Sequence, residues 1–130
     1  SSPADPTVTT NTTGVMMGLA GSITTRTGRT VIIITGAIVN NTGNDGGAVQ
    51  IRYGTGSAPG NGNALTGTTL GSLQRFVNAN LATEEAPFSV SGVVTTLTGG
   101  TAYWLDVGLA AITGGTTSIK NVSITAFDIP

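Results

Sequence analysis

The side chains that could do acid–base chemistry in this sequence are almost all carboxylates. The chain contains no His and no Cys, which removes the commonest general base, thiol nucleophiles and the usual ligands of transition metals. A glycosidase needs two carboxylates on either side of the bond that it cleaves. The candidates are Asp5, Asp45, Glu84, Glu85, Asp106 and Asp128. A catalytic role therefore depends on whether any two of them can face each other.

Two of these carboxylates, Asp106 and Asp128, lie within expected strands, and both follow apolar residues. Outward-facing acids at such positions more often solubilise a surface or pair with an Arg or with Lys120. Glu84 and Glu85 are adjacent and point in opposite directions if the chain is extended, so they make a poor pair. The sequence thus predicts no catalytic residue, no metal site and no cofactor. A hydrolase that uses unpaired carboxylates is the weakest alternative.

The composition restricts the possible partners. Charged residues make up 8% of the chain, against roughly 25% in ordinary soluble proteins. Five basic and six acidic residues leave a net charge of −1, so there is no basic footprint for nucleic acid or for an anionic membrane. The longest apolar run, at 31–34, is far shorter than the roughly 20 residues of a membrane helix. We expect no nucleic-acid partner and no membrane insertion.

The sequence pattern predicts strands, rather than helices, as the framework for these residues. Short runs rich in β-branched residues alternate with turn clusters, and 20 glycines supply the turns. We predict an all-β fold, a two-sheet antiparallel β-sandwich over residues 15–130, which is the size of one domain. Residues 1–14 hold two prolines and mostly Thr, Ser and Asn, and they are expected to form an extended arm or linker. This arm is either a frayed terminus or a tether to a preceding domain.

Periodicity places the individual strands. The expected strands are a weak one at 15–24, then 30–40, 48–53, 73–81, 88–96, 102–111 and 118–129. A solvated turn is expected at 82–87. Because the last strand is so apolar, it is expected at the centre of a sheet rather than at an edge. Its alternation puts Ile119 and Phe127 on one face and Val122 and Ile124 on the other.

The expected strand at 30–40 is apolar on both faces. Two sets of side chains alternate along it, namely Val31, Ile33, Ala37 and Val39, and Ile32, Ile34 and Ile38. A strand in a two-layer sandwich has one inner face, so the second apolar face needs another cover. That cover is either a neighbouring subunit or the chain's own loops.

Four segments resemble the successive strands of the complement globular-head and tumour-necrosis-factor-like jelly roll, namely GRTVIIITGAIVN, AVQIRYGTG, FSVSGVVTTLTGGTAYWLDVGLA and SIKNVSITAFDIP. The closest likeness is LTGGTAYWL at 97–105, where a turn enters a strand, and Phe127-Asp128-Ile129 is similar to the family's buried final strand. Residues 15–130 also resemble a domain met in bacteriophage virion and tail-associated proteins, through MMGLAGSIT, VQIRYGTG and YWLDVGLAAITGG.

The resemblance implies a homotrimer about a threefold axis, with apolar strand faces buried between subunits. The residues expected at that interface are Ile32, Ile34, Ile38, Tyr103, Trp104 and Phe127. The implied function is a non-enzymatic assembly, decoration or attachment module on a virion, a tail fibre or an extracellular surface. Its partners would be further copies of itself, other virion proteins or a cell-surface glycan. The low charge and aromatic content differ from the complement heads, which argues against a receptor-signalling role.

The alternative function is a carbohydrate-binding module. Residues 54–72 form a long Gly-rich segment, and loops of this length are usually functional or mobile. Tyr53, Tyr103 and Trp104 could offer rings on which a sugar stacks, although their positions within strands favour packing. The candidate ligand residues in and beside this loop are Tyr53, Thr55, Ser57, Asn61 and Asn63.

Overall fold

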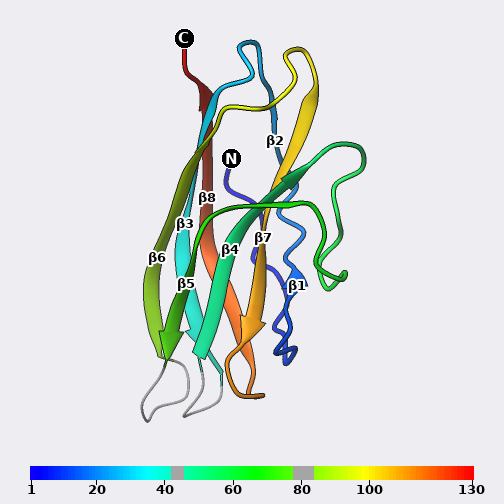
Figure 1. The fold of residues 1–130 in the computed structure, drawn as a ribbon. Helices are drawn as coiled ribbons and strands as arrows, with labels where there is room; N and C mark the ends of the chain where they lie inside the picture. The colour runs from blue at the N-terminus through cyan, green and yellow to red at the C-terminus, as the bar shows by residue number, and fades with distance from the viewer. Residues whose placement is uncertain (42–45, 78–83) are drawn as a thin grey trace.

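A computed structural model shows an antiparallel sandwich of two β-sheets (Figure 1), which confirms the predicted all-β fold. The structure describes residues 1–41, 46–77 and 84–130, so Asp45 and parts of the expected strand at 73–81 and turn at 82–87 lie outside the described residues. Within these ranges no helix has the length and apolarity needed to cross a membrane. The strands are β1 (Val15–Met16), β2 (Gly21–Thr24), β3 (Thr30–Asn40), β4 (Gly46–Gly54), β5 (Thr68–Val77), β6 (Glu85–Val94), β7 (Ala102–Ala111) and β8 (Thr117–Asp128).

The two sheets are interleaved along the chain. One sheet has the order β7-β4-β5, with β1 and β2 both paired to the other side of β7, and the second sheet has the order β6-β3-β8. From β2 onward, every connection except the one between β4 and β5 passes from one sheet to the other. Each sheet is therefore assembled from distant parts of the sequence. This order is compatible with a jelly roll.

The hydrophobic core lies between the sheets. Ile32 and Ile34 of β3 are 0% exposed and Ile38 is 2% exposed, and they belong to one buried cluster with Leu105 and Val107 of β7. A side chain that the chain's own second sheet already covers cannot contact another subunit. This corrects the expectation that Ile32, Ile34 and Ile38 face a subunit interface. The alternation separated the two faces of β3 but did not say which face points inward.

A β-bulge in β8 reverses the alternation of its side chains. The register with β3 shifts between Thr35 and Ala37, and Asn121 of β8 has a positive φ of 55°. One extra residue at a bulge moves every following side chain to the opposite face. Ile119 and Val122 are consequently buried in the same core, at 1% and 2% exposure. The expectation that these two residues face opposite sides is wrong.

Residues 1–14 run beside the edge of β8. The backbones of Thr9 and Thr117 exchange two hydrogen bonds, at 2.8 and 3.0 Å, and the backbone N–H of Asn121 donates to the carboxylate of Asp5 at 2.9 Å. Among the described strands β8 pairs with β3 alone, so it lies at an edge and not at the centre as expected. The arm covers part of that edge and protects its backbone groups from pairing with other chains.

Several strands begin earlier than the sequence indicated, and the difference is largest for β5 and β6. β5 starts at Thr68, inside the expected loop at 54–72, and β6 starts at Glu85, inside the expected turn at 82–87. Neither start has the apolar alternation that marks a half-buried strand. Their backbones pair with β4 and β3 respectively, and this pairing extends the strands beyond the apolar pattern.

Candidate functional site

Asp106 is a fully buried carboxylate on β7. Its oxygens accept hydrogen bonds from the backbone N–H groups of Gly18 at 2.9 Å, Leu19 at 3.1 Å and Val107 at 2.8 Å. Burial raises the pKa of Asp106 above its ordinary value of 3.8, and these donors, Leu19 first, offset part of the effect. The carboxylate serves as an acceptor for the chain segment that covers it, so its oxygens are not open to a substrate.

Asp128, the second strand carboxylate, is also committed to structure. Its Oδ1 accepts hydrogen bonds from the hydroxyls of Thr25 at 2.8 Å and Thr30 at 3.0 Å, and its Oδ2 accepts one from the backbone N–H of Arg26 at 2.6 Å. The bond from Arg26, followed by that from Thr25, lowers the pKa of Asp128 below 3.8. These bonds fasten the turn between β2 and β3 to the end of β8.

The part of the chain that the structure describes contains no group of three His, Cys, Asp or Glu residues that could hold a metal ion. The two strand carboxylates, the strongest catalytic candidates from the sequence, each accept at least three hydrogen bonds from their own chain. Both carboxylates thus serve as acceptors that hold neighbouring segments of the fold in place.

The loop between β4 and β5 folds back onto β1 and the arm. The backbone N–H of Gly62 donates to the carbonyl of Met16 at 2.9 Å, and the N–H of Met16 donates to the carbonyl of Asn63 at 2.9 Å. Asn61 Oδ1 accepts from the backbone N–H and the hydroxyl of Thr7, at 2.9 and 2.6 Å. Two of the residues predicted to bind a ligand, Asn61 and Asn63, thus tether this loop to the rest of the fold.

The aromatic rings near this loop are packed against the protein. Trp104 is 7% exposed, and its indole N–H donates to the carbonyl of Thr55 at 3.2 Å. Tyr53 and Tyr103 are half-buried and meet edge to face, with ring centroids 6.3 Å apart. A ring that stacks on a sugar must expose one face, and Trp104 does not. Its burial also removes Trp104 from the expected subunit interface, while Thr55 and Ser57 remain exposed.

A row of apolar side chains crosses the outer face of the β6-β3-β8 sheet. Val31 of β3 pairs with Val93 of β6 on one side and with Phe127 of β8 on the other. Val93 is 52% exposed and Phe127 is 50% exposed. Ile33, two residues along β3, lies on the same face and is half-buried. We call these four residues the outer apolar row, and Phe127 is the expected interface residue that belongs to it.

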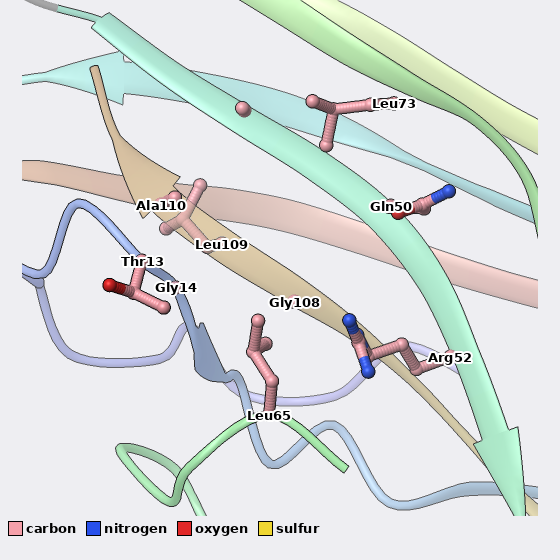
Figure 2. A pocket seen from close by; sticks show the side chains of 10 residues that line it. Thr13, Gly14, Gln50, Arg52, Leu65, Leu73, Gly108, Leu109 and Ala110 are labelled. Atoms are coloured by element: carbon pink, nitrogen blue, oxygen red, sulfur yellow. The ribbon is translucent and has the colours of Figure 1, made fainter. Parts of the chain in front are cut away.

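A groove crosses the outer face of the other sheet, over β7 and β4 (Figure 2). Its floor consists of small residues, Ala48 of β4 and Gly108 and Ala110 of β7. Leu65 and Arg52 lie at one end of the groove in Figure 2. An adjoining hollow of about 280 Å³ shares Ala48 and Ala110 with this floor and is lined on its β5 side by Leu73 and Arg75. We call the two together the outer groove.

Compared with models of protein families and with curated protein sequences, the chain has no match. The geometry of the two outer faces therefore carries the functional proposals.

Most of both surfaces cannot be recognised in the sequence. The alternation along β3 separates Val31 and Ile33 from the other apolar face of the strand. No local pattern places Val93 beside them, because the register of β3 with β6 joins residues about 60 positions apart. The outer groove is even harder to recognise in the sequence than the outer apolar row. Ala48, Gly108 and Ala110 are small residues at outward positions, and such residues carry no chemistry that would mark them in a sequence.

Proposed function

We propose that this domain is a non-enzymatic structural module that self-associates through the outer apolar row. The observation that carries the proposal is the alignment of Val93, Val31 and Phe127 across three neighbouring strands. About half of the surface of Val93 and of Phe127 is exposed. Burial of apolar surface is favourable by roughly 25 cal/mol per Å². A contiguous exposed apolar patch on a small domain marks an interaction surface.

The surroundings of the outer apolar row also suit a subunit contact. Ser91 and Thr125 flank Ile33 on the two neighbouring strands, so the next positions carry hydroxyls without charge. The ion pair between Lys120 and Glu85, at 2.7 Å, lies toward the other end of the sheet. Interface cores are depleted in charged residues because burial of an unpaired charge is costly. On this side a second copy can therefore cover the row without burying a charge. On the other side Arg29, two residues before Val31, is exposed at the end of the sheet, where its Nη1 donates to the carbonyl of Pro130 at 2.9 Å.

We propose a jelly roll as the finer description of the fold and a homotrimer as the assembly. The interleaved order of the two sheets supports the jelly roll. The threefold order, and a setting on a virion, tail fibre or extracellular surface with other virion proteins as partners, rest on the resemblance of residues 15–130 to bacteriophage and tumour-necrosis-factor-like domains. The buried Trp104 favours this role over the carbohydrate-binding alternative.

The test is the molar mass of the purified chain, measured by light scattering on a sizing column over a range of concentrations. We expect a mass near three times 12.9 kDa. Phe127→Ser and Val93→Ser should shift the protein toward the monomer. Val77→Ser is the matched control, because Val77 is 59% exposed but lies on β5 of the other sheet. A monomer at all concentrations, or equal dissociation by Val77→Ser, would rule out this interface.

A further inference from the structure

The outer groove is electropositive as well as partly apolar. Arg52 and Arg75 both line it, and none of the residues that line its two parts is acidic. Asp106 of β7 lies opposite Arg52 in the register of β4 with β7. Its carboxylate is buried, however, and its oxygens accept hydrogen bonds from backbone N–H groups. Among the described residues, the two positive charges on the rim of the groove thus have no compensating negative charge.

The two guanidinium groups are available to a ligand. Arg52 donates from Nη1 to the carbonyl of Thr66 at 3.2 Å, which orients the side chain and leaves most of its five N–H donors unused. The side chain of Arg75 makes no hydrogen bond or ion pair with the described residues, and it is exposed. A planar guanidinium pairs with a carboxylate through two parallel hydrogen bonds. Carboxylates are therefore the groups that this rim is suited to bind.

The shape of the outer groove is set by its small floor. A Cβ atom at Gly108 would lie 2.7 Å from Cδ2 of Leu65 and 3.3 Å from Nε of Arg52, so glycine allows both side chains to close over this end (Figure 2). Leu73, which is 51% exposed, adds an apolar rim on the β5 side. A ligand must therefore offer apolar or small groups to the floor between its charged groups.

The spacing along the strands indicates an extended ligand. Arg75 pairs with Ala48, and Arg52 lies four residues further along β4. At about 3.3 Å per residue, this places the two positions about 13 Å apart along the strand. In an extended peptide, side chains four residues apart lie on the same face at the same separation.

We propose that the outer groove binds an extended acidic segment of another polypeptide, with carboxylates four residues apart on Arg52 and Arg75 and a small or apolar side chain between them over Gly108. A polypeptide is favoured over an acidic glycan because none of the lining residues is aromatic, so the groove has no ring face on which a sugar could stack. The site is independent of the proposed self-association, since the outer apolar row lies on the opposite face of the sandwich.

The experiment measures binding of a fluorescent nine-residue peptide by fluorescence anisotropy. The peptide has Ser at its odd positions, Glu at its second and sixth positions and Val at its fourth and eighth positions. We expect saturable binding that weakens as salt is added, because exposed charge pairs are screened. A peptide with Gln in place of both Glu residues should bind about tenfold more weakly or worse, as expected for loss of charge-assisted hydrogen bonds.

Protein variants locate the site. Arg75→Gln and Arg52→Gln should each weaken binding of the Glu peptide by about tenfold. Arg26→Gln is the matched control, because Arg26 is an exposed arginine in the turn between β2 and β3, and it should leave the dissociation constant unchanged. A thermal melt of each variant checks that the fold is retained.

Three results would overturn the proposal. The first is the absence of saturable binding of the Glu peptide, or equal binding of the Gln peptide. The second is an equal loss on Arg26→Gln, which would indicate non-specific attraction to positive charge. The third is preferential binding of an oligomer of galacturonic acid that is lost in Arg52→Gln and Arg75→Gln, which would make the groove a site for acidic glycans instead.

Discussion

The carboxylate of Asp106 accepts a hydrogen bond from the backbone N–H of Gly18 at 2.9 Å. This contact holds the segment between β1 and β2 along the edge of β7, where the backbone N–H of Met17 also donates to the carbonyl of Val107 at 3.1 Å. Gly18 has a φ of +69°, and a Cβ atom there would lie 2.5 Å from the backbone nitrogen of Asn61. The loop between β4 and β5 therefore also packs against this position. One buried carboxylate and one glycine thus join the sheet, the first strand segment and the longest described loop.

Removal of the Asp106 carboxylate should destabilise the fold. Asp106→Ala leaves the N–H groups of Gly18 and Leu19 without their acceptor, and a buried donor without a partner costs about 1 to 3 kcal/mol. We expect a loss of about 2 to 4 kcal/mol in the free energy of unfolding, measured by urea titration. Asp106→Asn keeps one carbonyl acceptor and should lose less. A loss equal to that of an exposed control such as Gln74→Ala would contradict this role.

Asp128 should make stability depend on pH in the acid range. The pKa of Asp128 is lower in the folded protein than its ordinary value of 3.8, so its charged form is favoured by folding. This contribution is present above pH 3.8 and is lost as the pH falls through the folded pKa. The difference in urea midpoint between the native protein and Asp128→Asn should be constant near neutral pH and should shrink below pH 3.8.

Asp106 should give the opposite pH dependence of stability, and it therefore serves as an internal control. Its pKa is raised by burial, so its contribution is greatest below pH 3.8 and declines as the pH rises through the folded pKa. The stability of Asp106→Asn relative to the native protein should therefore improve as the pH rises. Parallel pH profiles for the two variants would contradict both assignments.

Alanine substitutions at two glycines in the loop between β4 and β5 should distinguish the cost of backbone strain from the cost of steric overlap. Gly67 and Gly62 both have positive φ, at +78° and +89°, so an alanine at either position costs about 1 to 2 kcal/mol. A Cβ atom at Gly67 would also overlap Cη2 of Trp104, whereas one at Gly62 meets nothing within 4 Å. Gly67→Ala should lose about 1 to 3 kcal/mol more than Gly62→Ala.

The measurement for this pair is thermal unfolding followed by tryptophan fluorescence, because Trp104 is the chain's single tryptophan. Gly67→Ala should also shift the emission spectrum of the folded protein, since the ring or the loop must move. An unchanged spectrum with equal melting temperatures for the two variants would show that the loop does not press on the ring.

Neighbouring isoleucines of β3 should have different roles. Ile32 is 0% exposed, so Ile32→Ala should cost about 2 to 5 kcal/mol in the free energy of unfolding. Ile33 lies in the outer apolar row and is half-buried, so Ile33→Ala should cost less stability but should weaken self-association. Urea unfolding and light scattering on the two variants measure both effects. Equal losses of stability with no change in mass would contradict the assignment of the two faces.

The bulge in β8 should tolerate glycine but not a β-branched residue. Asn121 has a φ of +55°, a conformation that costs about 1 to 2 kcal/mol for most side chains. Asn121→Val should lower the melting temperature, and Asn121→Gly should leave it nearly unchanged. If both variants melted at the same temperature, the bulge would not depend on the conformation of this residue.

The parts of the fold that are visible in the sequence are those with strong local alternation. β3 and β7 occupy the ranges 30–40 and 102–111 expected for them, because apolar residues recur at every second position along most of each strand. The inward set of β7, with Leu105, Val107 and Leu109, also follows directly from this alternation. A single strand carries enough local information to define its own two faces.

Local patterns in the sequence are sufficient to predict the all-β class, the positions of the best strands and the division of apolar residues between two faces. Long-range pairing in the folded chain sets which face of β3 points inward, places Ile119 and Val122 on one side of β8, and leaves β8 at an edge covered by the arm. This difference arises because side chains alternate along a strand with a period of two. One residue of register, or one bulge, exchanges the two faces of a strand, and both depend on pairing with strands that are distant in the sequence.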